Sequence, residues 1–188
     1  MTATAAPFGL RPAMHGSGGV IRPSRRAIDP AYTTALYKGT PVLIAADGTV
    51  NVAVANSGRV DGVFAGCEYT DSTGKRNISN FWPGTSGCTD IVAWVYDDPN
   101  LVFEVQANGT LASTTLAGGY GVAASPGSGS AQTGLSSASL DIATAGTTSK
   151  QMIVVDVAAA EDNAWGDTFT IVRVKLANSV FAAAVTAI

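Results

Sequence analysis

Short apolar runs, each bounded by turn residues, follow one another along most of this chain. In PVLIAADGTVNVAV, residues 41–54, Asp47-Gly48 separates two apolar stretches, which is the strongest short signal for a β-hairpin. We expect a second hairpin from residues 90–107, closed by DDPN, and two further strands within residues 151–158 and 167–177. Other strands are expected within residues 59–70 and 135–142. No long helical periodicity appears, so the sequence predicts a mainly β protein with a sandwich or barrel body.

The N-terminal part differs from this body in charge and in proline content. Residues 1–38 contain five basic side chains and the single acidic residue Asp29, whereas the rest of the chain contains six basic and thirteen acidic side chains. Four of the eight prolines also lie in residues 1–38, where they prevent a long helix or a regular central strand. We therefore predict an extended basic arm, residues 1–38, followed by a β-rich body, residues 39–188, with a variable loop region at about 110–150.

The composition favours a component of an assembly. Among 188 residues only 13% are charged while 46% are hydrophobic, which leaves much neutral surface available for contact with other proteins. The apolar segment VFAAAVTAI, residues 180–188, is expected at a contact between copies of the chain. No secretory pattern or continuous apolar run of about 20 residues occurs, so no membrane partner is expected and the protein is expected to remain in the compartment where it is made.

The residues needed for catalysis or for cofactor binding are sparse. His15 is the single histidine and lies in a Gly/Pro-rich segment that would hold it loosely, so no catalytic residue and no enzymatic activity are expected. The acidic groups in YDDPN and in residues 161–167 fit turns better than a cation site, so no metal is expected. The glycines form no phosphate-binding loop, so no cofactor is expected. Cys67 and Cys88 are expected to be free, mostly buried thiols.

The arginines of the N-terminal segment are the main candidates for binding. Their clustering is compatible with a solvated face, with an acidic protein partner or with nucleic acid. A sequence pI near 4.9 and the absence of interleaved aromatic residues argue against nucleic acid. We therefore predict that an acidic protein surface is bound through the guanidinium groups of Arg11, Arg22, Arg25 and Arg26.

Several stretches together resemble a family of tailed-bacteriophage virion proteins regarded as capsid cement or decoration proteins. The stretches are TAAPFGLRPAMHGSGG, YKGTPVLIAADGTV, VDGVFAGCEYTDSTGKRNISNFWP and DNAWGDTFTIVRVKLA. The resemblance covers most of the chain except residues 110–150, and none of these stretches is an active-site signature. It implies a structural role on the outer surface of the capsid, with the major capsid protein as partner and assembly in the host cytoplasm. Because such a shell offers three-fold and quasi-three-fold positions, we expect a homotrimer.

Two other functions remain open from the sequence. A β domain on the virion surface could bind host glycans, with Trp82 or Trp165 as the stacking platform, although these residues fit a core or an interface better. An enzyme acting on the cell wall is the weaker alternative, because the sequence provides no site for it.

If the N-terminal arm holds the protein on the capsid, deleting residues 1–28 should leave a folded β body whose attachment to capsids is lost or greatly weakened.

Overall fold

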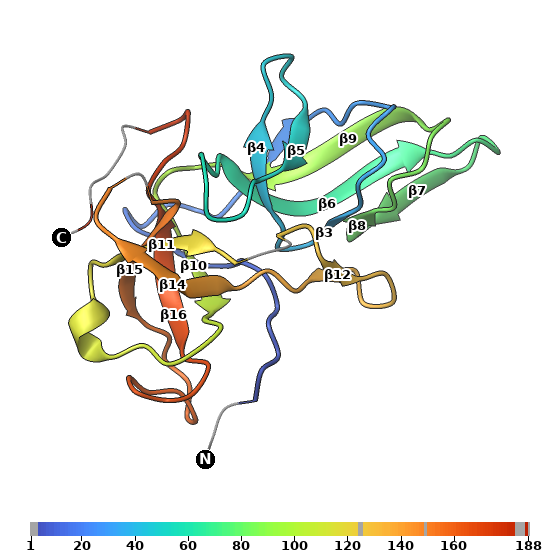
Figure 1. The fold of residues 1–188 in the computed structure, drawn as a ribbon. Coiled ribbons are helices and arrows are strands. Elements are labelled where there is room, and N and C mark those ends of the chain that lie inside the picture. The colour runs from blue at the N-terminus through green and yellow to red at the C-terminus, as the bar shows by residue number, and fades with distance from the viewer. Residues whose placement is uncertain (1–3, 124–125, 149, 183–186, 188) are drawn as a thin grey trace.

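The computed structural model describes residues 4–123, 126–148, 150–182 and 187. The chain is mainly β, as the sequence predicts, and the one helix among the described residues is the short 3-10 helix η1, Ser113–Thr115. Two six-stranded antiparallel sheets form most of the molecule. Figure 1 shows one of them in the lower left of the view, built from β10, β11 and β14–β16, and the other in the upper right, built around β6 and β9.

The first sheet, called sheet A here, combines the start of the chain with its second half. Its strands follow the order β1 (Arg11–His15), β10 (Leu101–Gln106), β16 (Ile171–Leu176), β15 (Met152–Val157), β11 (Gly119–Val122) and β14 (Leu140–Gly146). Along β16 the side chains alternate between the core and the outer face, because Val172, Val174 and Leu176 are buried while the residues between them are half-buried. This resolves the register of that strand, which the sequence leaves open.

The second sheet, sheet B, is formed by residues 24–96. Its strands follow the order β2 (Ser24–Arg26), β9 (Thr89–Tyr96), β6 (Gly62–Thr70), β4 (Pro41–Ile44) and β5 (Val50–Val52), and β7 (Arg76–Ser79) pairs with the distal half of β6. Two small two-stranded sheets complete the fold: β3 (Leu36–Tyr37) with β8 (Phe81–Trp82), and β12 (Gly129–Ser130) with β13 (Leu135–Ser136).

The hairpin expected around Asp47-Gly48 is confirmed. β4 and β5 pair antiparallel, and Gly48 adopts φ of +83°, a conformation that favours glycine. The Asp47 carboxylate accepts hydrogen bonds from both the backbone N–H and the hydroxyl of Thr49, which holds the turn closed. The two strands expected within residues 151–158 and 167–177 are also confirmed, as β15 and β16, and the structure shows that they pair with each other.

The second expected hairpin is wrong. β9 belongs to sheet B and β10 to sheet A, so the DDPN turn is a crossing between sheets. Its two carboxylates are bound by side chains from the N-terminal segment, Asp97 by Arg26 and Asp98 by His15. These long-range contacts direct β10 away from β9, and a local turn pattern carries no information about them.

Each sheet covers its own hydrophobic core. The first core contains Phe103, Leu140 and Met152 among others, and the second contains Phe64, Trp82 and Val95. Leu10 is buried in the first core and Ile28 in the second.

The segment expected as a separate arm is therefore built into both halves of the molecule. Residues 11–15 and 24–26 are extended, and they form edge strands, β1 on sheet A and β2 on sheet B. The boundary expected at residue 38 does not coincide with a boundary in packing, and a body without residues 1–28 would lack two strands and two core residues. The composition shift reflects edge strands, which tolerate proline and present charged residues to solvent.

Candidate binding surface and pocket

The four predicted arginines fall into two classes, of which the first is paired within the chain. Arg11 lies on β1 opposite Glu104 of β10, and its Nη2 donates to Glu104 Oε2 at 2.6 Å. Arg173 of β16 flanks the same carboxylate from the other side, with 3.5 Å between its Nε and Glu104 Oε1. Arg11 therefore belongs to a row of alternating charges across sheet A, which explains its position without a partner protein.

Arg26 is the second paired arginine. Its Nε donates to Asp97 Oδ2 at 2.9 Å, and its Nη2 contacts the same oxygen. The Asp97 side chain is only 8% exposed, so this guanidinium neutralises a buried carboxylate. The Arg26 guanidinium also lies over the aromatic ring of Phe181, with 4.9 Å between Arg26 Cζ and the ring centroid.

Arg22 and Arg25 form the second class. Both are exposed, and within the described part of the chain neither has a carboxylate within 4.0 Å. On β2 the side chains alternate, so that Arg26 turns inward while Arg25 faces solvent. These two guanidinium groups are free to meet an external acidic group.

Arg22 belongs to a connection between the two sheets, residues 16–23, which we call the crossing loop. Most of its residues are exposed, and Val20 retains 70% of its accessible surface. Ile21 turns inward and packs against the first core. The crossing loop thus presents an apolar and a basic group side by side on a segment that is fixed at both ends by sheet pairing.

His15 anchors the start of the crossing loop. Its Nδ1 accepts hydrogen bonds from the backbone N–H groups of Ser17, at 3.3 Å, and Gly19, at 3.1 Å. Its Nε2 consequently carries the proton that is donated to Asp98 Oδ2 at 3.0 Å. The pKa of Asp98 is lowered, mainly by the backbone N–H of Asn100 and then by His15. Both ring nitrogens of His15 are thus engaged within the chain, Nδ1 by two backbone N–H groups and Nε2 by Asp98. Ser17, His15 and Asp98 together therefore stabilise a turn.

The two cysteines are free and buried. Cys67 lies on β6, and its thiol donates a weak hydrogen bond to the carbonyl oxygen of Phe81 at 3.4 Å. Burial raises the pKa of Cys67 to about 12, which removes the thiolate that a nucleophile or a metal ligand requires.

The acidic stretch at residues 161–167 is organised as a turn. Asn163 Nδ2 donates to the carbonyl oxygens of Ala158 and Ile171, and Asp167 accepts from the backbone N–H of Ala164 at 2.7 Å. Within residues 4–123, 126–148, 150–182 and 187, no group of three or more His, Cys, Asp or Glu side chains is placed to hold a metal ion. None of the helices described there is long and apolar enough to span a membrane.

The two tryptophans considered as a sugar-binding platform differ in burial. Trp82 is fully buried, donates its indole N–H to the carbonyl oxygen of Tyr32 at 3.1 Å and meets Tyr69 edge to face. Trp165 is half-buried and packs against the first core. Burial thus rules out Trp82 as a binding surface and confirms the expectation of a core residue.

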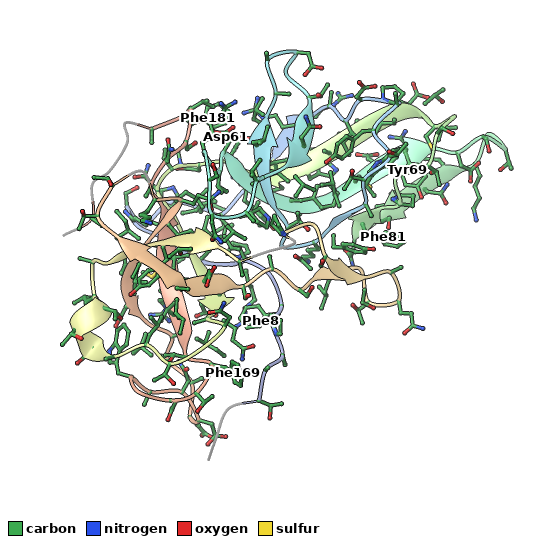
Figure 2. The ribbon with its side chains drawn as sticks, viewed as in Figure 1. Phe8, Asp61, Tyr69, Phe81, Phe169 and Phe181 are labelled. Atoms are coloured by element: carbon green, nitrogen blue, oxygen red, sulfur yellow. The ribbon has the colours of Figure 1, made fainter. Side chains whose placement is uncertain are left out.

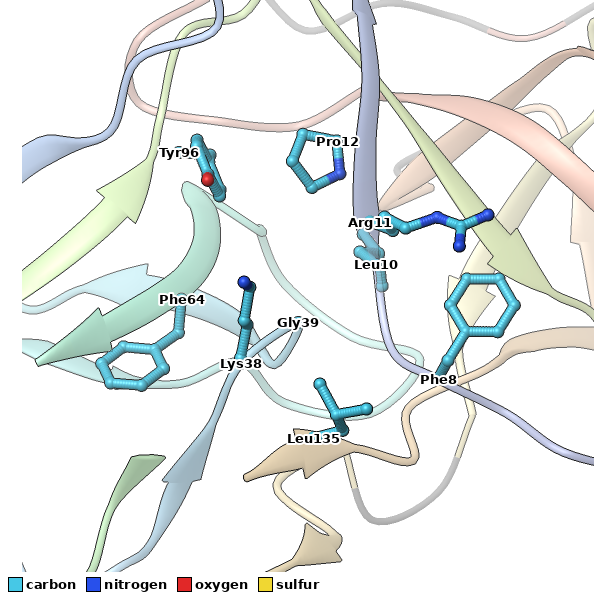
Figure 3. Close-up of a pocket in the computed structure, with 9 residues that line it drawn as sticks. All are labelled: Phe8, Leu10, Arg11, Pro12, Lys38, Gly39, Phe64, Tyr96 and Leu135. Atoms are coloured by element: carbon cyan, nitrogen blue, oxygen red, sulfur yellow. The ribbon is translucent and has the colours of Figure 1, made fainter. Parts of the chain in front are cut away.

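A pocket of about 310 Å³ lies where the N-terminal segment passes between the two sheets. Its apolar walls include Phe8, Leu10, Phe64 and Leu135 (Figure 3). The N-terminal segment approaches closely here because Leu10 N–H donates to the carbonyl oxygen of Gly39 at 2.9 Å. Sequence patterns do not reveal this pocket, because its lining comes from segments that are far apart in the chain.

Three polar side chains border the same pocket: Arg11, Lys38 and Tyr96. In Figure 3 the side chain of Lys38, which directly follows β3, extends toward Tyr96, whereas the Arg11 guanidinium turns toward Phe8. Lys38 has no carboxylate within 4.0 Å among the residues that the structure describes. An unneutralised ammonium group at an apolar pocket is a binding feature for a group with an acidic end.

A second hollow, of about 490 Å³, lies on the outer face of sheet A beside the C-terminal segment. Its apolar lining includes Ile153, Val155 and Phe181. Figure 2 places Phe181 close to Asp61, and Val180 N–H donates to Asp61 Oδ1 at 2.9 Å, so the C-terminal segment is fastened to sheet B. Of the segment expected between copies, residues 183–186 and 188 lie outside the described residues, while Val180 and Phe181 are exposed.

No family model matches the chain, and comparison with curated proteins and with solved structures also gives no match.

Proposed function

We propose that this protein is a structural component of a tailed-phage virion, a cement or decoration protein that binds the outer surface of the capsid and stabilises the lattice of the major capsid protein. The crossing loop and the adjoining strand β2 support this role most directly. On a protein that is acidic overall, they present the unpaired guanidinium groups of Arg22 and Arg25 near the exposed Val20. Arginine and exposed apolar groups are enriched at protein interfaces. A protein that binds the assembled shell in preference to free subunits stabilises the shell.

Attachment of charge-reversed variants to capsids tests this role. Arg22→Glu combined with Arg25→Glu should greatly weaken binding to shells of the parent phage that lack the protein, since two attractive contacts become repulsive. Lys75→Glu, a reversal at an exposed lysine of the turn between β6 and β7, is the matched control and should decorate normally. Normal decoration by the folded double variant would refute capsid binding through Arg22 and Arg25.

We further propose that the protein decorates the capsid as a homotrimer. Low overall charge and the apolar hollow on the outer face of sheet A favour contact between copies. Val155→Asp in this hollow should shift sedimentation from trimer to monomer, whereas Val54→Asp, at an exposed valine outside the hollow, should leave the trimer intact. A wild-type protein that sediments as a monomer at micromolar concentration would contradict self-association.

A further inference from the structure

The pocket between the two sheets has the size and the lining of a site for one large apolar side chain. Its volume of about 310 Å³ lies at the lower end of the range for ligand pockets. Phe8, Leu10, Phe64 and Leu135 provide its apolar surface. Such pockets bind the anchor residue of a partner in many protein interfaces.

The polar groups at this pocket favour an acidic neighbour of that anchor. The Arg11 guanidinium is neutralised by Glu104, which leaves Lys38 as the cation that no carboxylate of the described residues compensates. Tyr96 also lines the pocket, and its hydroxyl makes no hydrogen bond to the residues that the structure describes. An ammonium group and a hydroxyl together can donate to a single carboxylate.

Lys38 is held in place before any ligand arrives. Its backbone N–H donates to the carbonyl oxygens of Asn80 and Gly134, both at 2.9 Å, and its own carbonyl accepts from Ser136 N–H at 2.9 Å. Three hydrogen bonds to two segments, at Asn80 and at residues 134–136, therefore fix the backbone from which the ammonium group projects. A cation on a fixed backbone binds with a smaller loss of conformational entropy than one on a loose loop.

The adjoining edge of β1 favours a polypeptide as the occupant. β1 is the end strand of sheet A and pairs only with β10, so its other edge has no strand partner among the described residues. Arg11 and Pro12 of this strand line the pocket. An extended segment can lie along such an edge while it inserts a side chain into the neighbouring pocket.

We propose that this pocket binds an extended segment of a partner protein, which inserts one large apolar side chain between the sheets and places an acidic side chain against Lys38 and Tyr96. The site is independent of the crossing loop and of the proposed capsid role, because it is defined by the isolated chain and can be tested on it.

Titration with blocked tripeptides, followed by NMR, tests the site in the full chain. The probe is acetyl-Asp-Phe-Asp-amide, which carries an acidic side chain on either side of the anchor so that chain direction does not matter. Two controls remove one feature each: acetyl-Asn-Phe-Asn-amide lacks the charges and acetyl-Asp-Ala-Asp-amide lacks the anchor. We expect saturable shifts at Lys38, Tyr96 and Leu135, and an affinity at least about fivefold lower for either control.

Variants of the chain assign the charge selectivity to a residue. Lys38→Gln should bind the Asp and the Asn tripeptide equally, and Tyr96→Phe should reduce the difference between them. Lys75→Gln, which removes an exposed ammonium group elsewhere, should retain the wild-type preference. Amide spectra of each variant establish that the fold is unchanged.

Four outcomes would overturn the proposal. They are absence of saturable shifts at millimolar tripeptide, equal binding of the Asp and Asn tripeptides by the wild type, a charge preference that survives in Lys38→Gln, and shifts that map away from the pocket. Binding of N-acetylphenylalanine without binding of the blocked tripeptide would assign the pocket to a small molecule. Shifts of Lys38 and Tyr96 with protein concentration alone would assign it to a second copy of the chain.

Discussion

The guanidinium of Arg26 lies over the ring of Phe181, with Cζ 4.9 Å from the ring centroid. The same guanidinium pairs with Asp97, where the chain crosses from sheet B to sheet A. The Arg26 side chain therefore connects strand β2 with the DDPN turn that follows β9 and with the segment that follows β16. Removing the Arg26 side chain should therefore destabilise both sheets.

Replacing Arg26 should be far more costly than replacing Arg25. Arg26→Ala leaves the Asp97 carboxylate buried without its cation, which should lower the free energy of unfolding by about 3 kcal/mol. Arg25→Ala on the same strand removes an exposed, unpaired side chain and should change it by less than about 0.5 kcal/mol. Urea denaturation measures both, and equal losses for the two variants would contradict the pairing of Arg26 with Asp97.

Leu10 should contribute as much to stability as a residue in the middle of the body. Because its side chain is fully buried in the first core, Leu10→Ala should lower the free energy of unfolding by about 2–5 kcal/mol. Val20→Ala, on the exposed crossing loop, is the control and should have little effect.

Deletion of residues 1–28 should abolish cooperative unfolding in urea, and a cooperative transition in the truncated protein would show that β1 and β2 are dispensable.

Asp71 should give the protein a stability term that disappears in acid. Hydrogen bonds from the side chains of Thr73 and Asn77, and from the backbone N–H of Lys75, lower the pKa of Asp71 from 3.8 to about 2. Because the pKa is lower in the folded state, this contribution is fully present above the ordinary value and is lost as the pH falls toward about 2.

The comparison of Asp71→Asn with the wild type across pH measures this term. The difference in the free energy of unfolding should be constant near neutral pH and should shrink below about pH 4. Asp162→Asn, at an exposed carboxylate without a hydrogen-bond partner among the described residues, should show no such trend. A difference that grows as the pH falls would contradict the lowered pKa.

Both thiols should be unreactive until the protein unfolds. Burial raises the pKa of Cys67 to about 12, so its reactive thiolate is scarce at neutral pH, and Cys88 is buried as well. A chromogenic disulfide reagent should modify neither cysteine in the native protein and both of them in guanidinium chloride. Rapid reaction of the native protein, or a gain of two hydrogens in mass on reduction, would contradict buried free thiols.

The strand content of this chain is predictable because it depends on neighbouring residues. Asp47-Gly48 supplies a turn that needs a positive φ, and the flanking apolar runs pair across it as β4 and β5. The DDPN turn looks equally local, yet its carboxylates are bound by His15 and Arg26, which lie more than seventy residues away. A pattern within the turn cannot show that the two flanking strands belong to different sheets.

The candidate binding sites also differ in how much of them the sequence predicts. The clustering of arginines is visible in the sequence, but their division into paired and unpaired groups depends on Glu104 and Asp97, which reach them through the fold. The pocket between the sheets is not predictable at all, because Phe8, Lys38, Tyr96 and Leu135 meet only after both sheets have formed.

The order in which the ribosome releases the strands has a consequence for assembly of the fold. Every strand of sheet B lies within residues 24–96, so this sheet has all its members once β9 has emerged. β1 emerges before every strand of sheet B, but its partner β10 follows only after β9, and β16, which flanks β10 on its other side, emerges later still. Such pairing between distant segments forms slowly. β1 therefore lacks its strand partner until all the strands of sheet B have emerged.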